Sequence, residues 1–367
     1  MNRDLLYLHS FNLILFENYR ALKLLRRYFP TMEDAWRASH ADLSASGLRE
    51  KIVSQIITKR QQLDPEKEFL RLQKLGLGIL VPTDKFYPPL LREIHSPPQL
   101  LYLRGRAELC ASKNILSVVG SRKMTDYGKR VIADLVSELA RNDITIVSGL
   151  ALGVDQEAHT KTLEVEGKTI AVMASGLNDA NLYPRENYRL AKRISGIGAL
   201  VSEYPPFVAP HKHHFPIRNR IIAGISHGTL VVEAADKSGA LITAFQALEE
   251  NREVFAIPGN IDSPQSAGTN KLIKLGAKLV TSASDILEEL DLSSQQSYTK
   301  KDSYSPSSPQ EATILNILSQ GPRYLDEIKS LSALPINELN TILASLEIND
   351  IIKNLGGQQY ILNQSVK

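Results

Sequence analysis

The strongest constraint on the fold is an alternation of short apolar runs with helical patterns between Ile115 and about Leu290. The runs are rich in β-branched residues and read "ILSVVG", "ITIVSG", "KTIAVMASG", "GALVSEY", "GTLVVEA" and "EVFAIPG". Segments such as "YGKRVIADLVSELARN" and "SGALITAFQALEEN" lie between them and have helical spacing. Strands that alternate with helices in this way predict right-handed βαβ crossovers and a parallel sheet covered on both faces. The sequence therefore predicts an α/β, Rossmann-like domain over residues 115–290.

The N-terminal part of the chain has a different pattern. Residues 1–65 carry Leu, Ile and Tyr at helical spacings with few Gly or Pro residues, which predicts a small helical N-terminal domain. Prolines then cluster in residues 66–114, which indicates an extended connection into the sheet.

The C-terminal part also divides into two. Residues 291–310 are rich in Ser, Gln and Pro and cannot form a core, which predicts a flexible linker. Residues 311–367 contain three short helical patterns and two strands turning at Gly356-Gly357, an order typical of a winged-helix domain.

Composition limits the class of protein. The chain has 367 residues, 43% hydrophobic and 23% charged, so we expect a soluble protein of two or three domains without a membrane-spanning run or a secretory signal. Cys110 is the single cysteine, which excludes an intramolecular disulfide and fits a reducing compartment, so a cytoplasmic location is expected. The net charge of +3 is too small to identify a polyanionic partner.

The residues after the predicted strands indicate an anion-binding edge. In a parallel sheet, ligands bind beyond the carboxyl ends of the strands near the point where the strand order reverses. The first strand is followed by Gly120-Ser121-Arg122, in which glycine allows close approach, serine offers a hydroxyl group and arginine matches a phosphate with two donors. Loops after strands are also rich in Gly and Ser simply because they turn, but six such loops on one edge favour an anion site.

The stretch "HHFPIRNRIIAG" at residues 213–224 adds an aromatic residue to that edge. Phe215 lies between Pro210 and Pro216, with Lys212 and Arg218 nearby. An exposed aromatic ring in a cationic groove is typical of a site for single-stranded nucleic acid, because bases stack on the ring and cations follow the backbone. The alternative is that Phe215 packs beneath the following helix as a hydrophobic staple.

Several enzyme and metal sites find no support. The sequence has no G-x-x-x-x-G-K-[ST], no G-x-G-x-x-G after the first strand and no G-x-S-x-G. No carboxylate or cysteine flanks "HKHH" at a suitable spacing, so this segment is interpreted as a basic turn and no metal site is predicted. Asp155 is expected to cap the helix that it begins.

Eight motifs follow one another along the chain: "VGSRKMTDYG", "SGLALGVDQEAH", "KTIAVMASGLNDANLYPREN", "LVSEYPP", "HHFPIRNRIIAGIS", "VVEAADKSGALITA", "FAIPGN" and "GTNKLIKLGA". In this order and spacing they resemble the family of DNA processing protein A, also called DprA or Smf. The resemblance implies a protein that binds single-stranded DNA without sequence preference, protects incoming DNA in natural transformation and loads the RecA recombinase. It further implies a homodimer formed through the Rossmann-like domain, no catalytic residues, no cofactor and no membrane partner.

The resemblance also implies a set of DNA-binding residues. Ser121 and Arg122 would hold a phosphate, Lys212 would supply a cation and Phe215 a stacking ring. The complete set is Ser121, Arg122, Arg185, Lys212, Phe215, Arg218, Asn219, Arg220 and Lys237. Glycines expected to allow close backbone approach or tight turns are Gly120, Gly149, Gly153, Gly176 and Gly239.

The two flanking domains depart from a DNA-binding pattern. The segment "FNLILFENYRALKLLRRYF" lacks the turn glycine of a helix-hairpin-helix module, so no direct DNA contact is expected there. The presumed recognition helix of the winged-helix domain, "INELNTILASLEIND", is acidic, which favours protein contact or a spacer role.

Two other functions stay open. "SHGTLVVEA" resembles the Gly-Gly-x-Gly-Thr-x-x-Glu turn of nucleotide phosphoribohydrolases, with Gly228, Thr229 and Glu233 in place but without the leading Pro-Gly-Gly. In such an enzyme Glu233 would act on the ribose bond. The other hypothesis is a RecA-binding scaffold that uses its basic edge only for solubility.

Overall fold

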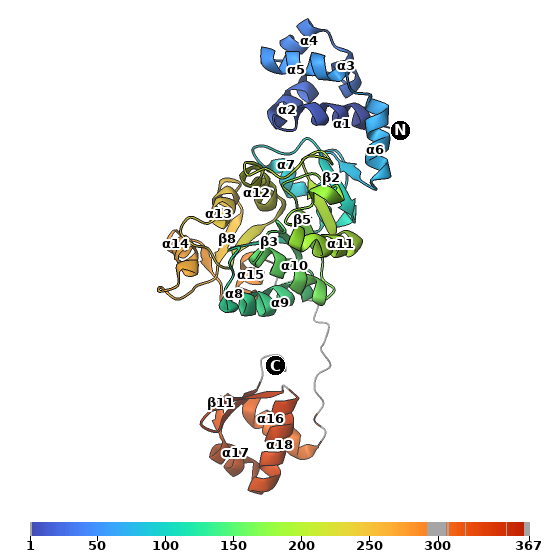
Figure 1. Cartoon of the computed structure of the whole chain (residues 1–367). Coiled ribbons are helices and arrows are strands. Elements are labelled where there is room, and N and C mark those ends of the chain that lie inside the picture. Colours follow the sequence, from blue (N-terminus) through green and yellow to red (C-terminus); the bar gives the residue numbers. More distant parts are fainter. Residues whose placement is uncertain (1, 292–305, 307, 320, 350, 363–367) are drawn as a thin grey trace. The chain divides into compact units, whose positions relative to one another are not determined.

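The computed structural model describes residues 2–291, 306, 308–319, 321–349 and 351–362, and divides into two compact units. The first unit, Met1–Gln295, holds the N-terminal helices and the large sheet, and the second, Gln296–Lys367, holds the small C-terminal fold (Figure 1). Among the described helices, none combines the length and the apolar character that crossing a bilayer requires.

The first unit is built on one sheet, which in the described residues has nine strands in the order β1-β2-β6-β5-β4-β3-β7-β8-β9. The strands from β6 to β9 are parallel, whereas β2 pairs antiparallel with β6 and β1 with β2. The six apolar runs of the sequence are β3 to β8, so the Rossmann-like prediction is confirmed. The strands are β1 Gly78–Leu80, β2 Leu101–Gly105, β3 Ile115–Val119, β4 Thr145–Ser148, β5 Thr169–Val172, β6 Ala199–Ser202, β7 Gly228–Val231, β8 Glu253–Ala256 and β9 Lys278–Leu279.

Helices cover both faces of this sheet, as the continuous apolar strands require. Val119 and Val231 pack into one core with α12 and α13, whereas Leu116 and Val118 pack on the other face with α8, α9, α10 and α15. Each such aliphatic side chain contributes roughly 1.5–3 kcal/mol when fully buried. The helices are α8 Asp126–Val131, continued through a π-helical turn at Ile132–Val136 into α9 Ser137–Arg141, then α10 Val154–Glu164, α11 Tyr188–Ile197, α12 His214–Ile225, α13 Gly239–Glu249, α14 Ala267–Lys274 and α15 Ala283–Glu289.

The strand order reverses between β3 and β7. The chain runs from β3 outward through β4, β5 and β6 on one side, then returns to place β7 against the other side of β3. The carboxyl ends of β3 and β7 therefore flank the topological switch point, where ligands of parallel sheets bind.

The N-terminal helices share a core with the sheet domain. Leu8 and Phe11 of the first helix pack in one cluster with Tyr102 and Ile194. Polar contacts fix this position, because Asn12 Nδ2 donates to the Glu203 carbonyl over 3.1 Å. The helices are α1 Arg3–Leu15, α2 Tyr19–Tyr28, α3 Met32–Arg37, α4 His40–Ala45, α5 Glu50–Arg60 and α6 Pro65–Lys74.

The segment predicted as an extended connection, 66–114, contains more structure than expected. It holds most of α6, the short helix α7 (Pro89–Glu93) and the strands β1 and β2, which widen the sheet. Pro65 and Pro89 stand in the first turn of α6 and α7, where the missing N–H is not needed, so these prolines begin helices rather than exclude them. β2 pairs with β6, which lies far along the chain, so local pattern does not reveal these two strands as part of the sheet.

The C-terminal unit has the predicted three helices and hairpin. In the described residues of this unit three strands are ordered β10-β12-β11, and the core contains Ile314, Leu339 and Leu362. The elements are α16 Pro309–Ser319, β10 Arg323–Tyr324, α17 Leu325–Ser332, α18 Ile336–Ile348, β11 Ile352–Gly356 and β12 Gln359–Leu362. Of the predicted linker 291–310, residues 292–305 and 307 lie outside the described residues.

Candidate functional site

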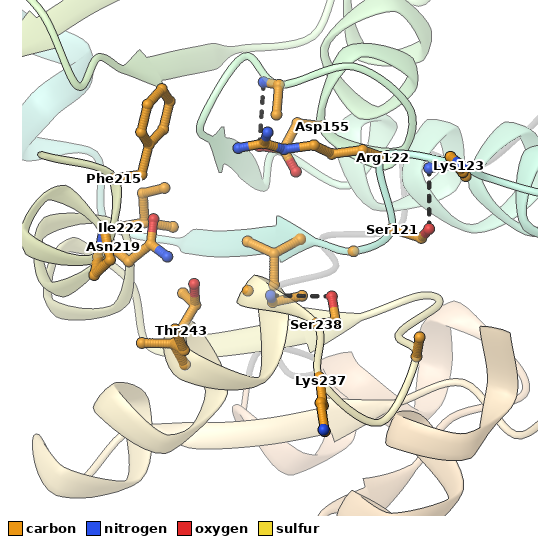
Figure 2. A pocket seen from close by; sticks show the side chains of 18 of the residues that line it. Ser121, Arg122, Lys123, Asp155, Phe215, Asn219, Ile222, Lys237, Ser238 and Thr243 are labelled. Carbon is orange, nitrogen blue, oxygen red and sulfur yellow. Dashed lines mark hydrogen bonds between the residues drawn. The ribbon is translucent and has the colours of Figure 1, made fainter. Parts of the chain in front are cut away.

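A cavity of about 400 Å³ opens at the carboxyl end of β3, at the switch point of the sheet (Figure 2). Its walls come from the turn after β3, the start of α12 and the loop that leads from β7 into α13. The lining residues are Val119, Gly120, Ser121, Arg122, Lys123, Ala151, Asp155, Phe215, Pro216, Arg218, Asn219, Ile222, Ala235, Lys237, Ser238, Gly239, Ala240, Ile242, Thr243 and Gln265. The fold thus gathers Ser121, Arg122, Phe215, Arg218, Asn219 and Lys237 of the predicted set around one cavity.

Arg122 and Phe215 lie next to each other at the wall of this cavity. Arg122 is exposed, and its guanidinium carbon lies 5.4 Å from the centre of the Phe215 ring, within cation–π distance. Phe215 is half-buried at the start of α12, with Tyr183 packed edge-on at 5.9 Å between ring centres. The ring is a wall of the cavity rather than a staple hidden beneath the helix.

Arg218 forms the buried floor beside Phe215. Its Nη1 donates to the carbonyl oxygens of Gly149, over 2.9 Å, and of Val172, and its Nε donates to Asn219 Oδ1. Burial lowers the pKa of Arg218 to about 10, while the nearby Asp155 carboxylate acts in the opposite direction. The guanidinium is therefore charged at neutral pH and is already hydrogen-bonded to protein carbonyls. It contributes positive electrostatic potential and a fixed floor to the cavity rather than a side chain that moves to meet a ligand.

Asp155 does not cap a helix through its side chain. The N-cap of α10 is Gly153, and Asp155 Oδ2 accepts hydrogen bonds from the N–H groups of Gly149 and Ala151 at 3.1 and 3.4 Å. The expected capping role is wrong because Asp155 is inside the first turn, from where its carboxylate folds back onto the loop after β4. Burial raises the pKa of this carboxyl group, and Arg218 lowers it.

The turn after β3 is held by its own hydrogen bonds. The N–H of Ser121 donates to the Glu233 carbonyl over 2.7 Å, and the Ser121 side chain accepts from the N–H of Lys123. Ser121 is buried, whereas Arg122 and Lys123 are exposed. Lys123 was not predicted as a site residue, although its place directly after Arg122 in the same turn is a signal that could have found it.

The opposite wall is the start of α13. Ser238 caps this helix by accepting from the N–H of Ala240 over 3.3 Å, and Gly239 follows with open space where a side chain would be. Lys237 is exposed just before the cap. The N-terminus of an eleven-residue helix and a lysine thus border the cavity, an arrangement that attracts anions. Around the cavity, Asp155 is the one carboxylate among the lining residues, against four arginine and lysine side chains.

Three predicted cations do not line the cavity. Arg185 is exposed and donates to the Asp179 carbonyl, and Lys212 is exposed just before α12. Arg220 is buried, forms an ion pair with Glu203 and donates to the Ser96 carbonyl over 2.8 Å. Arg218 and Arg220 are two positions apart, so their side chains leave α12 on nearly opposite sides, and only one of them can face the cavity.

At four of the predicted glycines, protein atoms occupy the space where a side chain would be, so that space is not open to a ligand. A Cβ atom at Gly149 would lie 2.6 Å from the Arg218 guanidinium, and one at Gly120 would lie 2.7 Å from Val154. Gly153 has a φ of +79° beside the Ser121 carbonyl, and Gly176 is crowded by the carbonyls of residues 205 and 206. These glycines shape the loops around the site, whereas Gly239 alone of the predicted glycines has open space.

The Glu233 carboxylate is occupied by structural hydrogen bonds and is not available as a catalytic group. Its carboxylate accepts hydrogen bonds from the N–H of Thr125, over 2.9 Å, and from the Thr125 hydroxyl group. Thr125 caps α8, and Glu233 is buried and does not line the cavity. The geometry therefore gives no support to a phosphoribohydrolase centred on Glu233.

Comparison with known proteins agrees with this architecture. Residues 78–291 match the family model of DNA recombination-mediator protein A, and residues 299–358 match that of the DprA winged helix domain. Protein Smf of Synechocystis sp. (strain ATCC 27184 / PCC 6803 / Kazusa) is 35% identical over 375 residues, covering 92% of this chain and 94% of that protein. The chain belongs to the DprA/Smf family. The C-terminal unit is accordingly a winged-helix domain, as predicted.

Other members of the DprA/Smf family match smaller shares of the chain. DNA processing protein DprA of Bacillus subtilis (strain 168) is 45% identical over 215 residues, 59% of this chain and 72% of that protein. The X-ray structure of DNA processing protein A from Streptococcus pneumoniae superposes with a TM-score of 0.65 at 39% identity, covering 74% of this chain and 93% of that one. A structure of DNA processing protein A from Helicobacter pylori, which concerns its single-stranded DNA binding mode, superposes with a TM-score of 0.53 at 29% identity. This match covers 59% of this chain and 96% of that one.

Proposed function

We propose that this member of the DprA/Smf family binds single-stranded DNA without sequence preference at the cavity between β3, α12 and α13. Phosphate groups contact Arg122, Lys123 and Lys237, and a base stacks on Phe215. The single observation that carries the proposal is the exposed Arg122 guanidinium beside the half-open Phe215 ring. A cation and an aromatic side by side bind the two chemically different parts of a nucleotide, whatever its base.

The arrangement of charges supports a polyanionic ligand. Three exposed cations surround a cavity whose floor is the buried Arg218 guanidinium, and the N-terminus of α13 adds its partial positive charge. The N–H groups at the start of α13 and the Ser121 hydroxyl group offer donors to phosphate oxygens. A mononucleotide would use only part of this wall, whereas a strand passing over it would use all of it.

We assign different roles to the predicted residues. Ser121, Arg122, Phe215, Asn219 and Lys237 make direct contacts within the cavity. Arg185 and Lys212 extend the path of the strand outside it. Arg218 and Arg220 have structural roles instead. Arg218 stabilises the loops beneath the cavity, and Arg220 lies between α12 and the N-terminal helices, where it contacts Tyr19.

The cellular role that we propose follows the family. The chain protects single strands that enter the cell in natural transformation and helps to load RecA on them in the cytoplasm. The family description as a recombination mediator and the single-stranded DNA named for the Helicobacter pylori protein support this role. A homodimer through the sheet domain would place two cavities on one strand and raise its avidity. We propose protein contact for the winged-helix domain, because α18 carries acidic residues and no basic ones.

Binding of fluorescent oligothymidine, oligoadenine and duplex DNA, measured by anisotropy, tests the proposal. We expect similar affinities for the two single strands, weaker binding of the duplex and a strong dependence on salt. Binding that is absent, or equal for duplex and single strand, would reject it. Incubation with AMP tests the phosphoribohydrolase alternative, and we expect no release of adenine. Assembly of RecA filaments on the bound strand tests the proposed loading of RecA. Sedimentation analysis tests the proposed homodimer.

A further inference from the structure

Three potential metal ligands meet where the N-terminal helices contact α12. One ligand atom from each of Glu17, His213 and His214 lies within 4.8 Å of the other two. Glu17 follows the end of α1, and the two histidines begin α12. The sequence around "HKHH" contains no carboxylate at ligand spacing, so this cluster exists only because folding brings Glu17 to it.

His214 is oriented as a metal ligand is. Its Nδ1 lies 3.2 Å from the Ala174 carbonyl oxygen, to which it donates as an N–H group, and Tyr204 stacks on the ring at 4.1 Å between centres. The side chain is 1% exposed, and Nε2 has no hydrogen-bond partner among the described residues. A buried acceptor without a partner is unfavourable, and a carbonyl on the other ring nitrogen is the usual support of a histidine that binds a metal.

The other two ligands are free to converge on that nitrogen. Glu17 and His213 are exposed, and His213 Nε2 lies 4.0 Å from Glu17 Oε1, which is longer than a good hydrogen bond. His211 stands close by, with its ring centre 5.5 Å from those of both His213 and His214. The ligand atoms of Glu17, His213 and His214 already lie within 4.8 Å of one another, and the side chains of Glu17, His211 and His213 are exposed.

We propose that Glu17, His213 and His214 bind a Zn²⁺ ion, with His211 able to complete a tetrahedral set. Imidazole nitrogens with one carboxylate oxygen are typical zinc ligands, whereas Mg²⁺ prefers oxygen alone. The ion would join the end of α1 to the start of α12, and Phe215 is the residue that follows His214. Zinc would in this way fix the stacking ring against the N-terminal helices.

Zinc binding is measurable without DNA, so its test is independent of the proposed function. The full chain, prepared without a histidine tag and stripped with a chelator, is titrated with Zn²⁺ against a chromophoric competitor. We expect one ion per chain, no competition by Mg²⁺, and an affinity that falls at least tenfold in His213→Ala and in Glu17→Gln. His40→Ala is the matched control, since His40 is an exposed histidine that also pairs with a glutamate, Glu50, at 2.8 Å.

Thermal unfolding separates a metal site from a merely structural histidine cluster. With chelator, the wild type and His213→Ala should unfold at the same temperature, because the removed side chain is exposed. With Zn²⁺, only the wild type and His40→Ala should gain stability. A wild type that binds no zinc at micromolar concentration, or variants of Glu17 and His213 that bind as tightly as the wild type, would overturn the proposal.

Discussion

The guanidinium carbon of Arg122 lies 5.4 Å from the centre of the Phe215 ring, although the two residues belong to different segments of the fold. Arg122 follows the central strand β3, and Phe215 starts the helix that returns the chain to the other side of that strand. Their meeting at the switch point turns two separate loops into one surface for a charged, aromatic ligand.

Replacing Arg122 should change the salt dependence of DNA binding. In Arg122→Ala we expect weaker binding of oligothymidine and a slope of log affinity against log salt that is flatter by about 0.7, the value for one single-strand phosphate contact. Anisotropy titrations at several salt concentrations measure both. Lys113→Ala is the control, because this exposed lysine precedes β3 at the opposite edge of the sheet. Equal slopes for all three proteins would contradict the contact.

Replacing Phe215 should weaken binding without altering that slope. Loss of a stacking ring costs about 1–3 kcal/mol per base, and no phosphate contact is lost with it. The same titrations on Phe215→Ala report affinity and slope together. Phe207→Ala serves as the comparison, since Phe207 is an exposed ring outside the cavity, covered by the Arg71 guanidinium at 3.7 Å. If both variants bind alike, Phe215 does not stack on DNA.

Arg220 should matter for stability more than for DNA. Arg220→Ala leaves the Glu203 carboxylate buried without its partner, and removal of one member of a buried pair costs about 3–5 kcal/mol. Urea denaturation measures the loss in free energy of unfolding. Under conditions where the variant is folded, we expect the wild-type salt slope for oligothymidine. A stable variant with a flatter slope would instead make Arg220 a phosphate contact.

Acid should destabilise the first unit through its buried histidines His9 and His159. Burial lowers the pKa of His9 to about 4 and that of His159 to about 3, against an ordinary value of 6.5. The folded protein therefore keeps both rings neutral while the unfolded chain takes up protons below pH 6.5, so stability falls as the pH drops toward 4. The slope approaches about 1.4 kcal/mol per pH unit for each histidine.

Urea denaturation between pH 7 and 5 tests this dependence. The variant His9→Gln keeps a side chain able to hydrogen-bond Tyr102, whose hydroxyl lies 2.8 Å from His9 Nδ1, but removes the titrating group. We expect a shallower fall in stability for this variant than for the wild type. A wild-type stability that is constant between pH 6.5 and 5 would show that the two rings are accessible to protons when folded.

Local sequence pattern was enough to predict the parallel strands β3 to β8 and the loop that forms one wall of the site. Strands buried on both faces must be continuously apolar, so β3 to β8 stand out in the sequence, and Gly120-Ser121-Arg122 follows directly from the end of one of them. The short strands β1 and β2 did not stand out, because their pairing depends on β6, which lies far along the chain. The proline-rich segment 66–114 was predicted as an extended connection because nothing in its local sequence shows this distant pairing.

The sequence by itself determined the alternation of β3 to β8 with helices, the winged-helix unit and the loop that carries Arg122, since each depends on neighbours in the chain. Only the tertiary structure decided that Arg218 faces the cavity while Arg220 pairs with Glu203, and that Glu17 reaches His213 and His214. Basic residues that are close in sequence do not by themselves show which side chains are available to bind a ligand. Burial and pairing with distant carboxylates and carbonyls settle that, and those partners are defined only when the chain has folded.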